Sequence, residues 1–583
     1  MQLDTEIKKF FKGDVESSQE VLEKYARDAS LLEVLPRIVV FPKNSEDIGA
    51  LVKWVNLENS RKENTDKLSI TPRSAGTCMS GGAIGESIIM DFTRYMNKIH
   101  SVEKVDGFFM KPMFKNSKEV VVSGVATLEP GVYYRELEEE ADKHNLLLPC
   151  YTASKSINAI GGMVGNNSAG EKSIRYGKTE DYVKELKVIF KDGYEYIVKP
   201  LNKKELYSKI AQTDFEGEVY KHIYNLIREN EMAIKAGKPD VSKNSAGYYI
   251  WNVLKDEEKN GGEFIFDLTK LIVGSQGTLG IVTEITLHLV EKKPISKLSV
   301  IFMKDVSRLG EVVDEILVHN PESLESYDDA TLKLAIKFFP DFLKKKGGFG
   351  MIKFMWSFLP EAMMMLFGGM PKLILLVEFS GDNDREINKK AKEMLNSIKH
   401  FGFKMRMTKS KSESEKYWDI RRESFALLRK HVKNKHTAPF IDDFVVNPEH
   451  LPEFLPKLNK ILDEYKNIEV TVAGHAGNGN FHIIPLMDFS DSKTGDTIIE
   501  LSKRVYKLVL EYKGSITGEH NDGLIRTPFL LQMYGQQVYN IFRDIKKIFD
   551  PQNMFNPRKK IGEGFDYIRE HIIKESHDHD HRS

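Results

Sequence analysis

The chain has few cysteines and no excess of charge of either sign. Its 583 residues include only two cysteines, Cys78 and Cys150, and its 85 basic residues balance 85 acidic ones. Two thiols cannot form a disulfide framework or supply the four thiolates of a zinc or iron–sulfur site. A nucleic-acid-binding protein needs a surplus of positive charge, so the zero net charge argues against that class.

The sequence also lacks a recognisable targeting or membrane-spanning segment. No long apolar run follows Met1, so no signal peptide is predicted. The most apolar stretch, Met351 to Met370, contains Lys353, Pro360 and Glu361, which argues against a membrane-spanning helix. We interpret this stretch as a helical hairpin that covers a functional site, with a surface for lipid or a partner as the alternative. The tail 577–581 is predicted to be solvated.

The length of the chain and its pattern of predicted helices and strands indicate several domains. A single hydrophobic core stops growing at roughly 250–300 residues, so a chain of 583 residues should contain at least two. The region up to about Asp28 is charged and amphipathic and predicts a helix. A strand at 37–41 and a helix from Ser45 to Val55, with Ser45 as its N-cap, then open an α/β region.

The second half of the chain has a different pattern of predicted elements. The charged segment Glu291–Pro294 is the predicted domain boundary before it. Strands are predicted at 298–303, 373–379 and 468–473, and long helices at 307–319, 384–401 and 412–433. This pattern indicates an α+β domain with an antiparallel sheet. The predicted ranges are an N-terminal helical segment at 1–34, a first domain at 35–293, a second domain at 294–562 and a tail at 563–583.

Three glycine-rich stretches lie in the first half, at 71–82, 161–170 and 274–280. Their small side chains allow backbone N–H groups to approach an anion closely. None of them fits a P-loop or the G-x-G-x-x-G fingerprint. One such loop alone is as often a tight turn as a ligand loop, but three in one domain favour a large cofactor that carries phosphates.

Four segments together resemble the vanillyl-alcohol oxidase / p-cresol methylhydroxylase superfamily of FAD-linked oxidases. They are Pro72–Thr77, Gly161–Gly170, Arg175–Gly177 and Leu271–Glu284. The resemblance is to the branch that contains D-lactate dehydrogenase, glycolate oxidase and D-2-hydroxyglutarate dehydrogenase, and it extends from about Tyr25 to Ile561. It implies an α+β fold: a PCMH-type FAD-binding domain of two α/β subdomains, and a C-terminal cap domain with an antiparallel sheet and flanking helices.

The resemblance also implies the residues that bind FAD. No histidine in these loops matches a covalent attachment site, so the FAD is expected to be non-covalent. Ser74 and Cys78 replace glycines that are common in the family, and Gln276 replaces the usual Glu. The predicted FAD-binding residues are Arg73, Ser74, Ala75, Gly76, Thr77, Met79, Ser80, Gly161, Gly162, Asn167, Gly277, Thr278 and Ile281.

A hairpin with two histidines is predicted in the second half. Asn478-Gly479 between two apolar runs is a strong hairpin signal. If these two residues form the whole turn, His475 and His482 are direct cross-strand partners. Their Cβ atoms would then lie roughly 4.5–5.5 Å apart, close enough for both imidazoles to reach one ion. On spacing alone, a pair of surface histidines is an equal alternative.

A second polar turn, Gly518-Glu519-His520, could supply a ligand and a base, although an ordinary polar loop has the same composition. The branch named above carries the paired patterns G-H-x-G-x-G-N-x-H and G-E-H, and both are intact here. The resemblance therefore implies that His475, His482 and Glu519 hold a divalent metal, zinc or manganese, and that His520 acts as general base.

Arg421 is the candidate for holding a substrate carboxylate, because a guanidinium binds such a group through two N–H donors. Two adjacent arginines on a helix are more often simply solvated, but the family's W-x-x-R pattern selects Arg421 over Arg422. Phe425 and Ile484 stand where the 2-hydroxyglutarate enzymes have polar residues that contact the substrate. A second carboxylate on the substrate is therefore not favoured.

The resemblance implies FAD-dependent oxidation of a D-2-hydroxy acid to the 2-oxo acid, with hydride transfer to flavin N5. D-Lactate is the first expectation, and D-2-hydroxyglutarate and glycolate are the others. Two cysteines leave no iron–sulfur relay, so a separate acceptor is expected: a quinone, an electron-transfer flavoprotein, a cytochrome or an iron–sulfur subunit. A cytoplasmic location is expected, and peripheral contact with the inner membrane face and a homodimer are left open.

Two other functions would share part of this sequence pattern. A non-redox flavoenzyme like alkylglycerone-phosphate synthase would share the flavin loops. A non-catalytic flavin subunit of an oxidase complex would be expected to have lost the metal and arginine positions. The intact G-E-H and two-histidine patterns favour the dehydrogenase.

Overall fold

The computed structural model divides the chain into two compact units. Unit 1 comprises Met1–Gly170, Tyr176–Lys292 and Ser515–Ile573, and unit 2 comprises Glu171–Arg175, Lys293–Gly514 and Lys574–Ser583. These units differ from the predicted sequence ranges, because a C-terminal segment returns to unit 1. The structure describes residues 3–61, 67–112, 117–255, 264–329, 331–333, 369–431, 435–466, 468–562 and 564–574.

Unit 1 begins with a four-stranded sheet in the order β1-β2-β4-β3. Strands β2 and β3 run parallel to β4, and β1 is antiparallel to β2. Every residue of β2 and β4 is buried, as expected for strands covered on both faces. The bounds are β1 (Asp14–Glu16), β2 (Ile38–Phe41), β3 (Ile70–Arg73) and β4 (Ile88–Asp91).

Two predictions for this region were wrong. The N-terminal segment is not one helix. Strand β1 lies between the short helices α1 (Leu3–Ile7) and α2 (Gln19–Tyr25) along the chain, and it pairs with β2. Ile7, Phe11 and Val15 are buried in the core, and this burial outweighs the helical pattern. Helix α3 (Ser45–Ser60) does follow β2, but its N-cap is Asn44, whose side chain accepts a hydrogen bond from the Asp47 N–H.

A larger antiparallel sheet completes the framework of unit 1, in the order β5-β6-β12-β8-β9, with β7 paired to β12. Burial alternates along β6 and β12, so one face of the sheet is turned to the core. These strands are β5 (Ile99–Met110), β6 (Val120–Leu128), β7 (Leu146–Leu147), β8 (Val183–Ile189), β9 (Glu195–Val198) and β12 (Ile281–Glu291), and a small ribbon joins β10 (Leu254–Lys255) to β11 (Ile265–Phe266).

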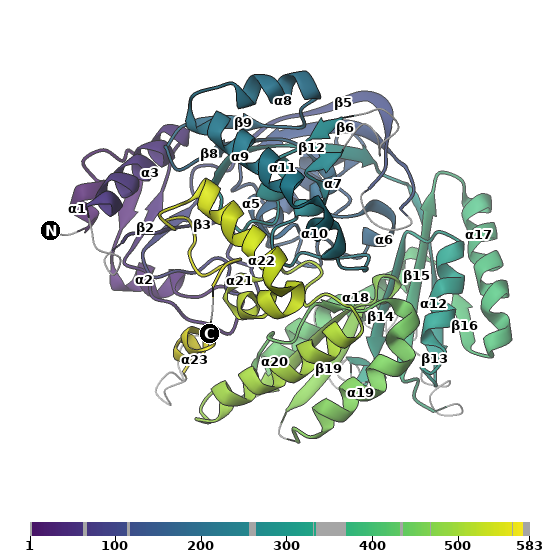
Figure 1. The fold of residues 1–583 in the computed structure, drawn as a ribbon. Coiled ribbons are helices and arrows are strands. Elements are labelled where there is room, and N and C mark those ends of the chain that lie inside the picture. Colours follow the sequence, from purple (N-terminus) through teal and green to yellow (C-terminus); the bar gives the residue numbers. More distant parts are fainter. Residues whose placement is uncertain are drawn as a thin grey trace, which may run out of the picture. The chain divides into compact units, whose positions relative to one another are not determined.

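Helices of unit 1 come from distant parts of the sequence. The long helix α22 (Leu530–Phe549) lies beside α9 (Phe215–Glu229) (Figure 1). The other helices are α4 (Tyr134–Asp142), α5 (Ile160–Asn166), α6 (Ser173–Tyr176, which continues from unit 2), α7 (Thr179–Tyr182), α8 (Lys203–Ile210), α10 (Glu231–Ala236), α11 (Thr269–Ile272), α21 (Gly523–Arg526) and α23 (Asp566–His571).

Unit 2 is built on an antiparallel sheet in the order β16-β13-β15-β14-β19-β20-β17, with β18 also paired to β20. The predicted α+β domain with an antiparallel sheet is confirmed. The strands are β13 (Ile295–Met303), β14 (Ser323–Asp328), β15 (Leu373–Gly381), β16 (Lys404–Met407), β17 (His436–Thr437), β18 (Phe444–Val445), β19 (Glu469–His475) and β20 (Asn480–Met487).

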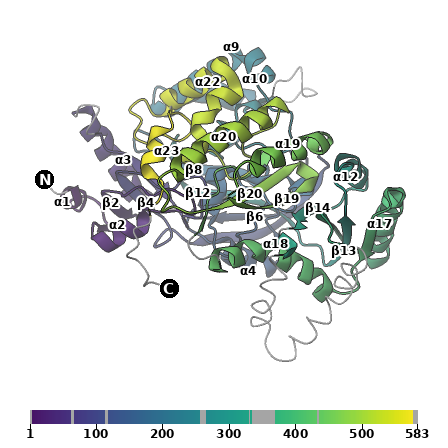
Figure 2. The same cartoon turned by 90° about the horizontal axis from the view of Figure 1, so that it is seen from below.

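One face of this sheet is covered by α18 (Lys411–His431). Tyr417, Trp418 and Ile420 of this helix pack with Val300 of β13 and Leu376 of β15 in one hydrophobic cluster. Helix α17 (Asp384–Ser397) packs against β13 and β15 and contacts α12 (Leu309–Val318) (Figure 2). Helices α19 (Leu451–Asp463) and α20 (Thr494–Glu511) complete the unit.

The apolar segment Met351–Met370 lies outside the described residues except for its last two positions, so its predicted helical hairpin stays a prediction. Among the described residues, no helix has both the length and the apolarity needed to cross a membrane.

Candidate active site

The glycine-rich loops meet in unit 1. Gly274 donates its backbone N–H to the Val164 carbonyl at 2.8 Å, and Gln276 donates its own to the Gly165 carbonyl at 2.9 Å. The first loop joins them through Ser74, because the Ser74 hydroxyl and the Gly161 N–H both donate to the Pro130 carbonyl, at 3.1 and 2.9 Å. We call these loops, at 70–82, 159–170 and 274–280, together with the turn at 518–523, the loop cluster.

Gln276 links three of these loops. Its Nε2 donates to Asn166 Oδ1 at 3.0 Å, and its Oε1 accepts from the Gly523 N–H at 2.8 Å. Asn556 adds a second link, because its Nδ2 donates to the Gly82 and Gln276 carbonyls at 2.9 and 2.7 Å. The side-chain amide of Gln276 therefore serves as donor and acceptor at once.

The loop surface fits a large ligand that contacts backbone. A Cβ on Gly161 would lie 2.6 Å from both the Pro130 carbonyl oxygen and the Ser74 hydroxyl, so only glycine allows these loops to pack. A Cβ on exposed Gly162 would meet nothing within 4 Å. Small residues with accessible backbone next to open space are what a dinucleotide cofactor requires. Ser74, Ala75, Gly76, Thr77 and Met79 are all half-buried in the first loop.

Other predicted FAD-binding residues make contacts that hold the loops in place. Arg73 donates through Nη1 to the Tyr25 and Ala83 carbonyls at 3.4 and 3.3 Å. The Thr278 hydroxyl is hydrogen-bonded to the Tyr248 hydroxyl at 2.7 Å. Ile281 is fully buried in the hydrophobic core, where its side chain supports the strand that follows the third loop. Ser80 is buried, Asn167 caps α5 in the left-handed region, and Gly277 has a positive φ.

The Gly518-Glu519-His520 turn is held against the first loop. The Ser80 hydroxyl donates to the His520 carbonyl at 3.2 Å. Glu519 is buried and its Oε2 accepts from Lys243 Nζ at 2.8 Å. The His520 imidazole is partly exposed, with Nε2 3.8 Å from Glu519 Oε1. Lys243 was not found from the sequence, since only the small residues that follow it, Asn244-Ser-Ala-Gly247, suggest a site there.

The predicted hairpin in unit 2 is confirmed, but its predicted turn is wrong. His475 pairs with Asn480, and Ala473 pairs with His482. The connection is longer than two residues because Ala476–Asn478 forms a 3-10 turn closed by Gly479 at φ 63°. A Cβ on Gly479 would lie 1.8 Å from the Val446 carbonyl oxygen, so this position needs glycine both for its φ and for space.

The two histidines still come together, as diagonal neighbours on one face of the hairpin. Their ring centroids lie 5.2 Å apart. His475 donates through Nδ1 to Glu325 at 2.6 Å, and His482 donates through Nδ1 to Asp442 at 3.0 Å. A histidine whose Nδ1–H is bound by a carboxylate carries its lone pair on Nε2, the form that binds a metal ion.

Arg421 lies beside this pair, on α18. Its side chain is buried, and Nη2 lies 3.3 Å from Glu325 Oε2. Its Nε is buried and has no hydrogen-bond partner among the residues that the structure describes. We call Glu325, Arg421, Asp442, His475 and His482 the sheet-face cluster. Their donor and acceptor atoms fit a divalent metal held by two imidazoles and an anion held by a guanidinium.

Arg422 has a different environment. Its guanidinium binds Glu171 through Nε and Nη2 at 3.2 and 2.5 Å, and it lies 4.8 Å from the Trp418 ring centroid. The residue is exposed. Arg422 is therefore engaged in a bidentate ion pair on the outside of α18, while Arg421 is turned into the sheet-face cluster.

Sequence reasoning missed Glu325 and Asp442. Each is at most 1% exposed. An acidic residue in a strand pattern such as Ser323-Leu-Glu-Ser-Tyr-Asp328 normally faces solvent, so the sequence carried no signal for Glu325. The consecutive acids Asp442-Asp443 after an apolar segment were the one sign that could have been followed. The third predicted metal ligand, Glu519, belongs to unit 1.

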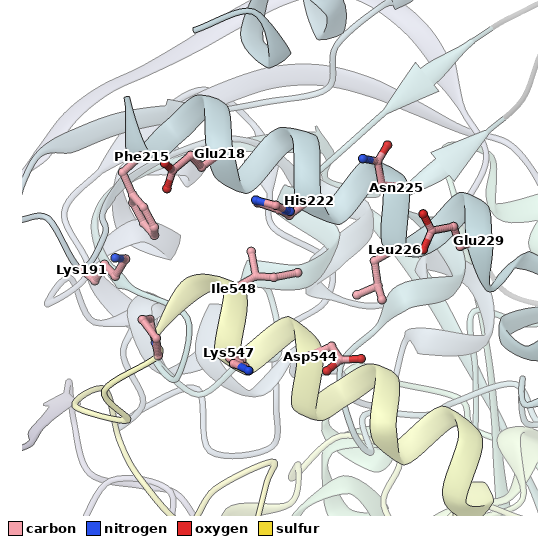
Figure 3. A pocket seen from close by; sticks show the side chains of 11 residues that line it. Lys191, Phe215, Glu218, His222, Asn225, Leu226, Glu229, Asp544, Lys547 and Ile548 are labelled. Carbon is pink, nitrogen blue, oxygen red and sulfur yellow. The ribbon is translucent and has the colours of Figure 1, made fainter. Parts of the chain in front are cut away.

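A groove on unit 1 lies apart from all these residues. It has a volume of about 540 Å³ and is lined mainly by α9 and α22 (Figure 3). His222, Asn225 and Leu226 come from α9, while Asp544 and Lys547 come from α22. None of the predicted site residues lines it.

Two sequence families match the chain. Residues 36–198 match the family described as FAD binding domain, and residues 294–560 match the family described as FAD linked oxidases, C-terminal domain. The chain is 24% identical to D-2-hydroxyglutarate dehydrogenase of Escherichia coli (strain K12), over 94% of this chain and 50% of that protein. The chain thus spans about half the length of the first curated relatives it matches.

Other relatives are similar over most of both chains. The glycolate oxidase subunit GlcD of Bacillus subtilis (strain 168) is 24% identical, over 92% of this chain and 91% of the relative. D-lactate dehydrogenase of Archaeoglobus fulgidus is 24% identical, over 90% and 91%. Among solved structures, 4-ethylphenol oxidase from Gulosibacter chungangensis has a TM-score of 0.64 at 12% identity, covering 94% of both chains.

Two further solved structures have the same fold. p-Cresol methylhydroxylase has a TM-score of 0.62 at 15% identity, covering 94% of both chains. Alkyldihydroxyacetonephosphate synthase has a TM-score of 0.64 at 15% identity, covering 95% of this chain and 85% of the other. At these identities the likeness concerns the fold alone, and it confirms the predicted fold class.

Proposed function

We propose, since the chain belongs to the family of FAD-linked oxidases, that it is an FAD-dependent dehydrogenase that oxidises a D-2-hydroxy acid to the 2-oxo acid. Three of its relatives are named for D-2-hydroxyglutarate, glycolate and D-lactate. All three compounds combine a carboxylate with a hydroxyl on the adjacent carbon. A site for them needs an anion anchor and a means of removing the hydroxyl proton.

The observation that carries the proposal is the unsatisfied hydrogen-bond donor of Arg421. Its Nε is buried without a hydrogen-bond partner among the described residues, beside two histidines held in the metal-binding tautomer. A buried donor left unsatisfied costs about 1–3 kcal/mol. A substrate carboxylate would satisfy that donor and receive a charge-assisted hydrogen bond. Arg421 is therefore proposed to bind and orient the carboxylate.

His475, His482 and Glu519 are proposed to hold a divalent metal, zinc or manganese, which would lower the pKa of the substrate hydroxyl. FAD in the loop cluster would accept the hydride from the substrate Cα. His520 takes the hydroxyl proton onto its imidazole as general base. Glu325 and Asp442 keep the two ligand histidines in the required tautomer through their Nδ1–H groups.

The side chain of Ile484 supports a substrate with a small, apolar R group. Ile484 is two residues from His482 on β20, so both side chains point to the same face of the sheet, and Ile484 is 5% exposed. An apolar residue there offers no partner to a second carboxylate. This favours D-lactate over D-2-hydroxyglutarate. Phe425, the other departure from the hydroxyglutarate enzymes, has no described side chain.

The electrons are proposed to leave the reduced flavin for a separate acceptor. The chain's two cysteines are both buried, and two thiols cannot hold an iron–sulfur cluster with four cysteine ligands. A quinone, an electron-transfer flavoprotein, a cytochrome or an iron–sulfur subunit would each fit this requirement. A cytoplasmic site of action is part of the same proposal.

Anaerobic flavin reduction tests the proposed function. The FAD-loaded protein is mixed with D- and L-lactate, D-2-hydroxyglutarate and glycolate, and loss of the oxidised-flavin absorption band is recorded. We expect rapid bleaching with D-lactate, slower bleaching with the other D-acid and with glycolate, and none with L-lactate. Absence of bleaching with every 2-hydroxy acid would refute the proposal and favour a non-redox flavoenzyme.

Metal dependence is tested in the same assay. After chelation and gel filtration, bleaching by D-lactate should become slow, and added Zn²⁺ or Mn²⁺ should restore it. Full activity of the metal-free protein would remove the metal from the proposal while leaving the flavin reaction in place.

A further inference from the structure

Glu325 contacts two members of the sheet-face cluster at the same time. Its Oε1 accepts the His475 Nδ1–H at 2.6 Å, and its Oε2 lies 3.3 Å from Arg421 Nη2. The Glu325 side chain is 2% exposed. Both carboxylate oxygens are thus engaged with a ring or guanidinium nitrogen, in a place where water cannot substitute for either partner.

The position of Glu325 follows from strand register. On β14 it lies opposite Leu376 of β15, which packs under α18. The neighbouring pairs, Ser326 with Gly474 and Tyr327 with Ala473, bring Glu325 beside His475 at the end of β19. A residue on a central strand facing a covering helix has little freedom to move, so its carboxylate is a fixed point between β19 and α18.

We propose that Glu325 is a positioning residue that couples carboxylate binding at Arg421 to metal binding at His475. This inference rests on the proposed function. One buried carboxylate fixes the tautomer of the histidine and the orientation of the guanidinium. Removing its charge therefore disturbs both sites together. A residue that only stabilises the fold would not link the two binding events.

Asp442 provides a matched comparison. Like Glu325, it is a buried carboxylate that accepts a hydrogen bond from the Nδ1 of a cluster histidine, here His482 at 3.0 Å. Among the described residues, the ion pair of Arg421 is with Glu325 and the one given for Asp442 is with His482. Glu325→Gln and Asp442→Asn each remove one charge with almost no change in shape. The two variants should differ only in what happens at Arg421.

The experiment measures two affinities for each FAD-loaded variant. Zn²⁺ affinity is measured by competition with a chelating dye. Carboxylate affinity is measured at saturating Zn²⁺ with propionate, which has no 2-hydroxyl group, through the change in the flavin absorption spectrum. Both variants should lose about 10- to 100-fold in Zn²⁺ affinity. Only Glu325→Gln should also lose about 10-fold in propionate affinity.

A double-mutant cycle assigns the second loss to Arg421. Arg421→Met should weaken propionate binding, and adding Glu325→Gln to it should cause no further loss. The inference is overturned if Glu325→Gln and Asp442→Asn behave alike, or if the propionate effect of Glu325→Gln persists without Arg421. If Glu325→Gln does not fold, Glu325→Asp, which keeps the charge but shortens its reach, must show the same paired losses.

The cycle also separates this inference from the proposed function. If Arg421→Met binds propionate as well as the natural chain does, the carboxylate role of Arg421 fails and the coupling fails with it. If Arg421→Met loses propionate binding while Glu325→Gln retains it, only the coupling fails. Bleaching by D-lactate, measured independently, reports on the flavin reaction in either case.

Discussion

The loop cluster of unit 1 and the sheet-face cluster of unit 2 are held together by different kinds of contact. In the loop cluster, amides and backbone groups join the glycine-rich loops, as in the contacts of Gln276 and Asn556, and the turn 518–523 adds the ion pair of Glu519 with Lys243. In the sheet-face cluster, Glu325 and Asp442 bind histidine and arginine side chains. Small residues and amides present backbone to a large ligand, whereas buried charged side chains aim a few strong donors at a small one.

The strongest test of this contrast concerns His520, the one predicted proton acceptor in the loop cluster. His520→Ala should slow flavin reduction by D-lactate about 10²- to 10⁴-fold, because the hydroxyl proton loses its acceptor. FAD content should stay unchanged, since the contact to Ser80 uses the His520 backbone carbonyl. Stopped-flow absorption measures the rate. An unimpaired rate would remove His520 from the reaction.

The adjacent arginines offer the next test. Arg421→Met should lower kcat/KM for D-lactate about 10²- to 10³-fold, because a buried charge-assisted contact to the carboxylate is lost. Arg422→Met serves as control: it breaks the ion pair with Glu171, whose carboxylate is buried, and should cost about 1–3 kcal/mol of stability while leaving kcat/KM nearly unchanged. Equal kinetic losses in the two variants would contradict the assignment of Arg421.

Glu378 should make the stability of unit 2 depend on pH. Burial raises the pKa of Glu378 to about 7, and Glu322 and Glu171 add to this while Lys172 opposes it. Between its ordinary range and pH 7 the folded state keeps a proton that the unfolded state releases, so stability falls as pH rises through this interval. Above pH 7, Glu378→Gln should therefore stabilise unit 2 by about 3 kcal/mol.

Chemical denaturation at pH 5 and pH 8 measures this difference, which should fall below about 1 kcal/mol at the lower pH. Unit 1 offers a counterpart of opposite sign. Burial lowers the pKa of Lys559 to about 7, so its contribution to stability rises with pH from about 7 toward the ordinary lysine range. Lys559→Met should remove that rise. A Glu378→Gln effect that is the same at both pH values would contradict the assignment.

The smallest expected effect concerns the amide links of the loop cluster. Gln276→Ala removes the acceptor of the Gly523 N–H and the amide donor to Asn166 Oδ1, and it should weaken FAD binding about 10-fold. Gln276→Glu should bind FAD within about 3-fold of the natural chain, because the Asn166 amide can rotate and donate to the carboxylate. Flavin fluorescence titration measures both. Equal losses would show that shape, and not hydrogen bonding, matters at this position.

Much of the framework followed from local patterns. The strand at 37–41, the helix after it and the antiparallel sheet of the second half were predicted because burial and period agree there. The N-terminal segment failed because β1 pairs with a strand more than twenty residues away. A three-residue strand has no periodic signal of its own, and only its partner makes it a strand.

The residues that carry the chemistry of the candidate site could be predicted from the sequence. The buried side chains that contact them could not. His475, His482, Glu519, His520 and Arg421 could be named because rare residue types recur in fixed spacing. Glu325 carried no signal, and the signs at Asp442 and Lys243 were weak, because acids and lysines are common on every surface. The burial of these three residues is what sets them apart. The hairpin register also depended on a contact outside the hairpin, at Val446.

The scarcity of cysteine and the balanced charge argued against disulfide frameworks, four-thiolate sites and nucleic-acid binding. The glycine-rich loops and the histidine spacing indicated which ligands to expect. Tertiary structure alone decided which carboxylate meets which cation. That choice depends on strand order and register, which bring together residues 150 positions apart such as Glu325 and His475. A sequence specifies such pairs only through the whole fold, since no local rule ties two residues so distant along the chain.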